Sequence, residues 1–318
     1  MALQAAVSLG LLALLLGVLP WPGLRAAWSR VTWGVWLGAL AGFLAGHVLG
    51  AVKWRALVNA GRAALRPGDA AGYYGAALFA NLCLPGVVGG DLLRAGLAAR
   101  RTGRTEAAIL GGVADRLSDV AGTALLVLGG ALAARGVLAP TAARLLEVLV
   151  ALGALAALAL VLATRRPLAR WPRRLRRPVG RTLVALRYLL RRPGAALLAL
   201  GISLVMQAGF VLVNAQLGRA VGITVPLAVW FVAWPLAKLA GLVPISLGGL
   251  AVRDATLAAL LAPAGVPVAL GVAAGLVWQS VLLGGGLVGA LVWWWHSGGL
   301  RLRIPQPVRS PAGGSAAR

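Results

Sequence analysis

Long apolar runs separated by short arginine-rich stretches are the feature that most constrains how this chain can fold. Several runs, residues 2–19 and 106–130 among them, are long enough to cross the ~30 Å hydrocarbon core of a bilayer as helices. The chain is 60% hydrophobic and 12% charged, whereas a soluble domain carries about 25% charged residues. The sequence therefore predicts an all-α, polytopic integral membrane protein with about six to eight membrane helices.

The net charge of +24 is carried mainly by arginines in the stretches between the apolar runs. Cytoplasmic loops that face anionic lipid show this pattern, so we expect both termini in the cytoplasm and no nucleic-acid partner. The richest stretch, residues 164–192, holds 11 arginines and is interpreted as a cytoplasmic basic loop. It would anchor the topology, bind anionic lipid or dock a soluble enzyme. Residues 301–318 are predicted to be a disordered basic tail.

The spacing P-x-x-x-G-G-x-x-x-R occurs twice, half a chain length apart, first from Pro85 to Arg94 and again from Pro244 to Arg253. The first copy closes an apolar run, residues 70–90, that has basic residues on both flanks. If both flanks are cytoplasmic, the run enters and leaves the membrane on one side. Such a re-entrant hairpin tolerates irregular backbone only where it is buried in protein or lines a wet cavity.

The same topology has the second broken segment, residues 226–263, entering from the opposite side. We therefore predict one transmembrane domain over residues 1–300, with inverted half-repeats at about 1–135 and 140–296, an architecture that places transporter sites at the midplane between halves. The alternative interpretation is a set of about eight ordinary spans.

Four segments resemble the lysylphosphatidylglycerol synthase transmembrane-region family, also called flippase-like membrane proteins. They are Trp54–Leu57, Asn81–Arg94, Asp115–Leu117 and Pro244–Asp254. The resemblance implies a bacterial inner-membrane protein that handles phospholipid or polyprenyl-lipid headgroups. Founding members of the family continue into a cytosolic aminoacyl-transferase domain, and this chain stops after a short tail, so lipid aminoacylation by this chain is not expected.

Charged and polar residues within the apolar runs are the candidate binding site, because a charge inside a membrane costs roughly 2.5–3.5 kcal/mol on insertion scales. Guanidinium groups offer paired donors to a phosphate, and glycine pairs can expose backbone N–H groups to an anion. The predicted headgroup-binding residues are Asn81, Gly89, Gly90, Asp91, Arg94, Gly248, Gly249, Arg253 and Asp254.

A second group, Asp115, Arg116 and Asp119, lies within one apolar run, with the two acids four residues apart on one helical face. These residues would bind a cation, relay protons or lock helices together. Lys238 is expected to snorkel or to pair structurally, and His47 is expected to be a hydrogen-bonded core residue.

No catalytic residue, metal site or cofactor is predicted, because no local metal motif such as H-E-x-x-H is present. Cys83 is the only cysteine. The leading hypothesis is a translocator of phospholipid or lipid-linked headgroups. The alternatives are a membrane-embedded transferase acting on a lipid-linked phosphate, and a membrane partner subunit for a soluble lipid-modifying enzyme.

Overall fold

A computed structural model describes residues 28–83, 88–134, 187–241 and 252–297, together with four single residues, Arg25, Leu162, Gly180 and Val184. Several predicted features lie outside the described residues. These are the first span at 2–19, a span predicted at 145–163, most of the basic loop at 164–192, the second glycine pair and the tail at 301–318.

Four long helices form the frame of the described structure. They are α3 (Trp33–Ala60), α6 (Thr105–Ala134), α9 (Pro193–Val221) and α12 (Val268–His296). Each has 28 to 30 residues and is apolar enough to cross a membrane, and at 1.5 Å per residue each exceeds the ~30 Å hydrocarbon core. The prediction of a polytopic all-α membrane protein is confirmed in the part of the chain that the structure describes.

The α3 helix is longer than the sequence indicated. Basic residues from Lys53 onward predict that this span ends near Val52, but the helix continues to Ala60. Lys53 is 1% exposed and lies against carboxylates of α6, which offsets the cost of burying its charge. The charge therefore marks an ion pair inside the bundle and not the start of a loop.

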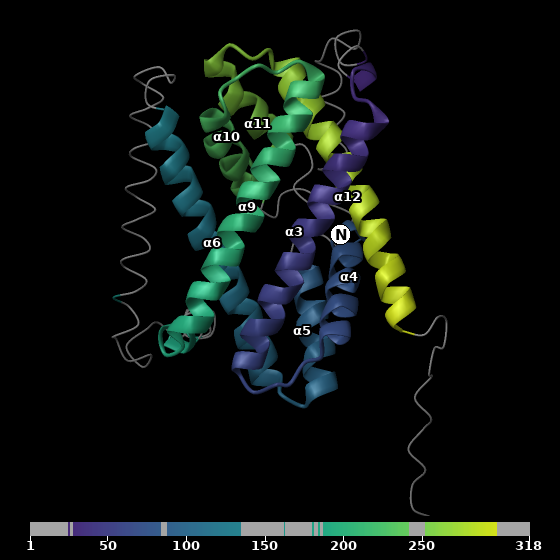
Figure 1. Ribbon diagram of the computed structural model, residues 1–318, viewed down its shortest axis with the longest axis vertical. Coiled ribbons are helices and arrows are strands. Elements are labelled where there is room, and N and C mark those ends of the chain that lie inside the picture. Colours follow the sequence, from purple (N-terminus) through teal and green to yellow (C-terminus); the bar gives the residue numbers. More distant parts are fainter. Residues whose placement is uncertain are drawn as a thin grey trace, which may run out of the picture.

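Two helical hairpins lie between the long helices. The first consists of α4 (Pro67–Cys83) and α5 (Val88–Thr102), and the second of α10 (Leu227–Ala240) and α11 (Val252–Leu261), which a short 3₁₀ turn at Ala262–Ala264 follows. Figure 1 shows that the first hairpin opens toward the lower end, where α3 ends and α6 begins. The second hairpin opens toward the upper end, where α9 ends and α12 begins.

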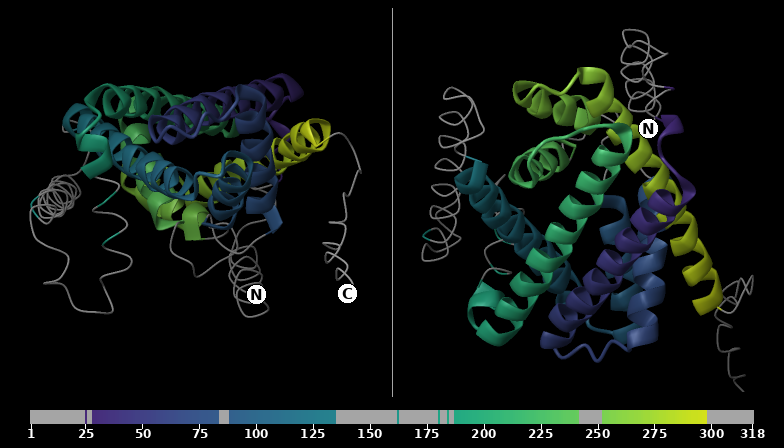
Figure 2. Two further views of the ribbon diagram at one scale, coloured as in Figure 1. Left: turned by 90° about the horizontal axis from the view of Figure 1, so that it is seen from below. Right: turned by 45° about the horizontal axis from the view of Figure 1, so that its top comes forward.

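The helices α3 and α9 cross in close contact and form one side of the molecule (Figure 2). Glycines recur every four residues along α3, and three of them face a neighbour closely. A Cβ at Gly42 would lie 2.7 Å from Val213, and one at Gly46 would lie 2.5 Å from Phe210. The seam of small residues thus lets the two helices approach, as small-x-x-x-small faces do in membranes.

Each hairpin packs on the last long helix of the other half of the chain: α4 lies on α12, and α10 lies on α6. In the α4–α12 contact, a Cβ on Gly75 would come 2.7 Å from the carbonyl oxygen of Gly289, and one on Gly289 equally close to that of Gly75. The lower end of the contact is held by Asp69 of α4, which lies 3.4 Å from His296 of α12.

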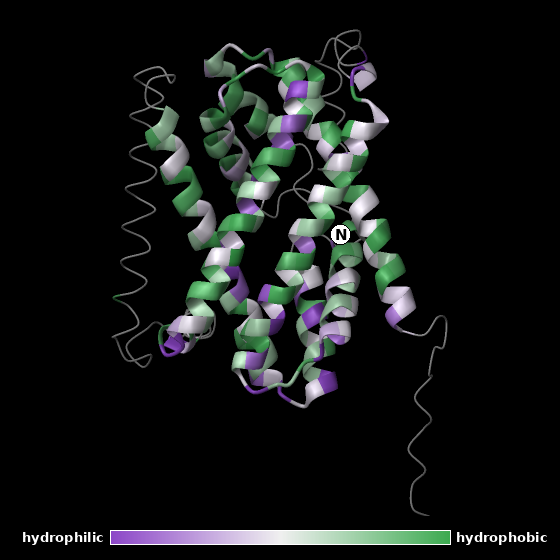
Figure 3. Ribbon diagram, in the orientation of Figure 1, coloured by the Kyte–Doolittle hydropathy of each residue, from purple (hydrophilic) through white to green (hydrophobic). Residues whose placement is uncertain are grey.

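Hydrophobic residues predominate along most of α6, α9 and α12 in Figure 3. Large hydrophobic residues such as Leu128, Val205 and Leu287 are exposed there. Hydrophilic residues gather at the lower end and inside the bundle. A lipid environment accounts for this distribution, because exposed apolar faces of this extent are otherwise buried in a partner.

Candidate functional site

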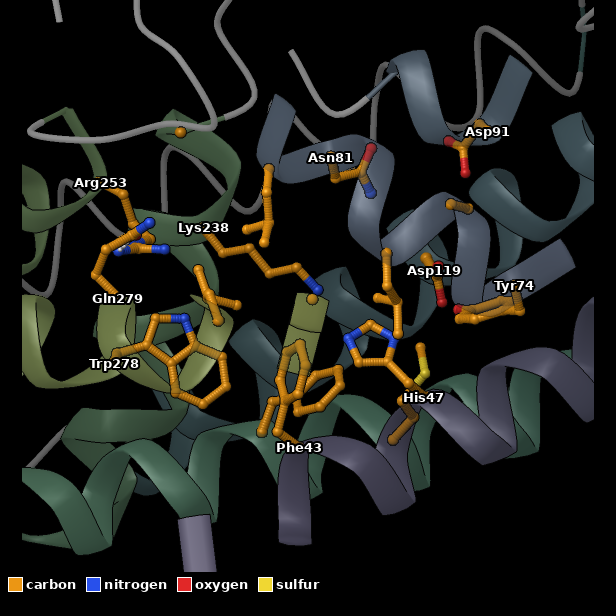
Figure 4. Close-up of a pocket in the computed structure, with 18 of the residues that line it drawn as sticks. Phe43, His47, Tyr74, Asn81, Asp91, Asp119, Lys238, Arg253, Trp278 and Gln279 are labelled. Atoms are coloured by element: carbon orange, nitrogen blue, oxygen red, sulfur yellow. Dashed lines mark hydrogen bonds between the residues drawn. The ribbon is translucent and has the colours of Figure 1, made fainter. Parts of the chain in front are cut away.

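A cavity of about 320 Å³ lies where the two hairpins meet between the long helices. Its lining includes charged residues from α5, α6, α10 and α11, together with aromatic and aliphatic side chains of α3, α9 and α12. Figure 4 shows Arg253, Lys238 and Gln279 on one side and Asp91, Asp119 and Tyr74 on the other. The cavity therefore has one polar group from each half of the chain and apolar walls between them.

Asp115 on α6 is the centre of the first polar group. One of its oxygens lies 2.6 Å from a terminal nitrogen of Arg94 on α5, and the other lies 3.1 Å from Nζ of Lys53 on α3. The side chains of all three residues are at most 3% exposed. Such a buried arrangement is stable only because each charge has an opposite charge in contact.

The network continues from Asp115 in both directions along α6. Lys53 Nζ also donates to Asp119 at 2.5 Å and to the Ser203 hydroxyl of α9 at 2.9 Å, and Ser203 donates to Asp119 at 3.0 Å. Arg116 pairs with Asp91, the carboxylate that also lies 2.8 Å from Arg94. These long-range connections join α3, α5, α6 and α9.

Aromatic rings enclose the guanidinium of Arg94. Its central carbon lies 5.0 Å from the Trp54 ring and 4.9 Å from the Tyr74 ring, which are cation–π distances. Two carboxylates at hydrogen-bond distance and two rings therefore surround Arg94, while its other terminal nitrogen has no hydrogen-bond partner in the described segments.

Asn81 and Gly90 close the first hairpin. The Gly90 N–H donates to Oδ1 of Asn81 at 3.0 Å, and any side chain at Gly90 would collide with Asn81 and with the Ala77 carbonyl. This contact explains one glycine of the predicted pair by close approach of α4 to α5. Gly89 beside it is half-buried.

The second polar group centres on Arg253 of α11. Its Nε and one terminal nitrogen donate to the same Asp254 oxygen at 2.9 and 2.7 Å, and the terminal nitrogen also donates to Oε1 of Gln279 on α12 at 3.1 Å. The guanidinium lies 5.7 Å from the ring of Trp234 on α10. Asp254 is 1% exposed and packs against Gly275, where a Cβ would collide with it.

Lys238 of α10 has a neutral hydrogen-bond partner, whereas the other cations described above pair with carboxylates. Its Nζ donates to the neutral side chain of Gln207 at 2.7 Å and lies 5.5 Å from the Phe210 ring. Six of the seven acidic residues lie in the described segments, and none of these six forms an ion pair with Lys238.

Besides the free terminal nitrogen of Arg94, two donors or acceptors on cavity-lining rings have no hydrogen-bond partner in the described segments. They are Nδ1 of His47 and Nε1 of Trp234. His47 packs among Phe43, Tyr74 and Phe210. The predicted hydrogen-bonded core histidine is therefore a cavity residue whose Nδ1 is unsatisfied within those segments.

The structure brings most of the sequence-predicted site residues together. The cavity lining includes Asn81, Asp91, Arg94, Asp115, Arg116, Asp119 and Arg253. Asp254 stands behind Arg253, and Gly248 and Gly249 lie outside the described residues. Sequence reasoning missed Lys53, Gln207, Trp234 and Gln279. For Lys53 the signal was present, since Trp54 and Arg55 beside it belong to a family-like motif.

No group of three or more His, Cys, Asp or Glu side chains that could hold a metal ion occurs among residues with described positions. The cavity's carboxylates are instead occupied by Lys53, Arg94, Arg116 and Arg253. This part of the site can thus hold a polar ligand by charge and hydrogen bonds, and it offers no preformed carboxylate cage.

Residues 1–289 match the family described as lysylphosphatidylglycerol synthase TM region. No curated protein and no solved structure matches the chain.

Proposed function

Because the chain belongs to the lysylphosphatidylglycerol synthase TM region family, we propose that it binds the headgroup of an anionic phospholipid or lipid-linked substrate and translocates it across the membrane. The headgroup would pass through the cavity between the two hairpins while the acyl chains remain in the bilayer. The observation that carries this proposal is the convergence of Arg94, Asp115, Lys238 and Arg253, from four helices, on one cavity with apolar walls.

The arrangement of the helices supports an inverted repeat. In each half a long helix, a helical hairpin and a second long helix follow one another, and the hairpins open toward opposite ends (Figure 1). Alternating access in such folds comes from motion of one bundle against another around a central site. We propose that the protein lies in a bacterial inner membrane with both termini in the cytoplasm.

A translocation assay tests the function directly. Purified protein in liposomes should move a fluorescent anionic phospholipid between leaflets faster than empty liposomes do. Leu282→Trp enlarges a side chain that lines the cavity and should slow transport. Leu291→Trp is the matched control, because Leu291 lies on the same helix with 63% of its surface exposed. Equal transport by empty and protein-containing liposomes would contradict the proposal.

The topology has its own test in cysteine labelling of intact cells. In a Cys83→Ala background, single cysteines replace Gly68 and Thr105 at the open end of the first hairpin, or Thr224 and Ala262 at that of the second. All are outside the left-handed backbone region. An impermeant maleimide should label only the second pair. If only one member of a pair is labelled, the two ends of that hairpin lie on opposite sides of the membrane, and the hairpin crosses it.

The alternative functions give different results in the same preparations. A membrane-embedded transferase would convert a labelled lipid-linked phosphate to a new product in the purified protein without moving it. A partner subunit would leave the lipid unmoved and would co-purify with a soluble enzyme through residues 164–192.

A further inference from the structure

We propose that the phosphate of the headgroup binds on the second-hairpin side of the cavity, with Lys238 as its counter-charge and the indole N–H of Trp234 as a hydrogen-bond donor. This inference rests on the proposed function and specifies where within the cavity the anion is held. The inference assigns no phosphate contact to Arg94, one of the headgroup-binding residues predicted from the sequence.

The first polar group has no charge left for a ligand. Lys53, Arg94 and Arg116 are its three cations, and each lies in an ion pair with at least one of its three carboxylates. One terminal nitrogen of Arg94 has no hydrogen-bond partner in the described segments, but the three cations and three carboxylates of this group already balance. A phosphate bound there would add a negative charge to a group with no net charge, which is unfavourable in a buried site.

Among the described residues, the second polar group has one more cation than it has carboxylates. Arg253 and Asp254 form a neutral pair, whereas Lys238 donates its hydrogen bond to a neutral amide, that of Gln207. A half-buried cation inside a membrane protein with no ion-pair partner in the described segments is costly, and such a charge marks a ligand or ion pathway. Figure 4 shows the Lys238 side chain extending from the second-hairpin side toward the middle of the cavity.

Trp234 supplies the independent observation. It is 2% exposed and lines the cavity, and its Nε1–H has no acceptor in the described segments. Trp234 and Lys238 are four residues apart on α10, so their side chains lie on one helical face. A buried indole N–H usually has a partner, and a phosphate oxygen next to Lys238 would satisfy it.

The charge of this site defines the ligand class. One uncompensated cation is neutralised by one negative charge, which is the charge of a phosphodiester. A zwitterionic headgroup would bring an ammonium whose natural partners, the carboxylates of the first polar group, are already paired. The site therefore favours a glycerophospholipid headgroup with a single net negative charge, of the phosphatidylglycerol type, over phosphatidylcholine.

Binding measurements on the detergent-purified chain test the inference. Isothermal titrations use dioctanoyl phosphatidylglycerol, dioctanoyl phosphatidylcholine and inorganic phosphate. Lys238→Met should weaken phosphatidylglycerol binding by about 10- to 100-fold, the range for a charge-assisted hydrogen bond, and should leave phosphatidylcholine binding unchanged. Lys238→Arg should retain most of the affinity. Trp234→Phe keeps a ring and removes the N–H, and should weaken binding less than Lys238→Met does.

Arg219→Met is the control for net charge, because it removes the same charge from an exposed position near the end of α9. Selective binding of phosphatidylglycerol that Lys238→Met leaves intact would overturn the inference while the proposed function stands. Inorganic phosphate binding as tightly as the lipid would overturn the lipid assignment of this site. Failure of both lipids to bind would overturn the proposed function and the inference with it.

Discussion

The two polar groups of the cavity differ in how their charges are balanced. In the first, three cations and three carboxylates from α3, α5 and α6 form a closed network. In the second, Arg253 pairs with the one described carboxylate, Asp254, and Lys238 donates to the neutral Gln207. We therefore propose that the same kinds of side chain serve different purposes, with the balanced network holding helices in place and the unbalanced one binding a ligand.

Two lysines show the difference most directly. Lys53 is fully buried and touches two carboxylates and a hydroxyl, whereas Lys238 is half-buried and touches an amide and a ring. Removing the first should therefore reduce stability, and removing the second should reduce binding. The following variants separate these outcomes, and all can be measured as changes in the free energy of unfolding in detergent.

Asp115→Asn should have the largest effect. The substitution keeps the shape of the side chain but leaves Arg94 and Lys53 without their shared carboxylate, and breaking a buried ion pair costs about 3–5 kcal/mol. Denaturant unfolding followed by circular dichroism measures the change. Glu106→Gln is the control, because Glu106 is an exposed acid in the first turn of the same helix. A loss no larger than that of the control would show that the first polar group does not hold the bundle.

Lys53→Met should come next. The methionine fills the space of the lysine stem, but Asp119 keeps only the Ser203 hydroxyl as a described partner. Loss of a hydrogen bond to a charged group costs about 1.5–3 kcal/mol. The double variant Lys53→Met with Asp119→Asn should recover part of that loss, since it removes the unpaired charge. Strict additivity of the two substitutions would indicate that the residues do not interact.

Arg116→Gln should lower stability by less than about 1 kcal/mol. Arg116 pairs with Asp91, but its side chain is 40% exposed, and exposed ion pairs contribute about 0–1 kcal/mol. A thermal shift assay against wild type measures the effect. A loss as large as that for Asp115→Asn would mean that exposure does not separate the members of the network.

Lys238→Met should have the smallest effect on stability, within about 1 kcal/mol of wild type. The variant loses the hydrogen bond to Gln207, which lowers stability. It also loses a charge inside the membrane that costs roughly 2.5–3.5 kcal/mol on insertion scales, which raises stability, so the two effects oppose each other. The same unfolding experiment, read beside Lys53→Met, gives the comparison. Destabilisation equal to that of Lys53→Met would identify Lys238 as structural.

The sequence predicted the fold class and the family well, because apolar length and short motifs are local signals. It also identified the charged residues that line the cavity, because charges inside apolar runs are rare and need a shared partner. The division of these charges into a closed and an open group was not predictable. That division depends on which side chains from distant helices meet, such as Lys53 with Asp115.

The neutral polar residues were the hardest to foresee. Gln207 and Gln279 carry no charge and lie within long apolar helices, so nothing in their neighbours distinguishes them from tolerated polar substitutions. Their significance comes from contact with Lys238 and Arg253. The end of α3 was predicted too early for a related reason. Lys53 was interpreted as a loop residue, because the sequence does not show that Asp115 and Asp119 lie against it.

The close backbone contact between Gly75 and Gly289 has a mechanical consequence. Glycines that leave no room for a Cβ let α4 and α12 pack in close backbone contact. Asp69 and His296 add a contact at the lower end of the two helices. The first hairpin is therefore joined to a helix from the other half of the chain, so a movement of α4 would disturb α12 as well. Because α11 also packs on α12, that disturbance would reach the second hairpin through the same helix.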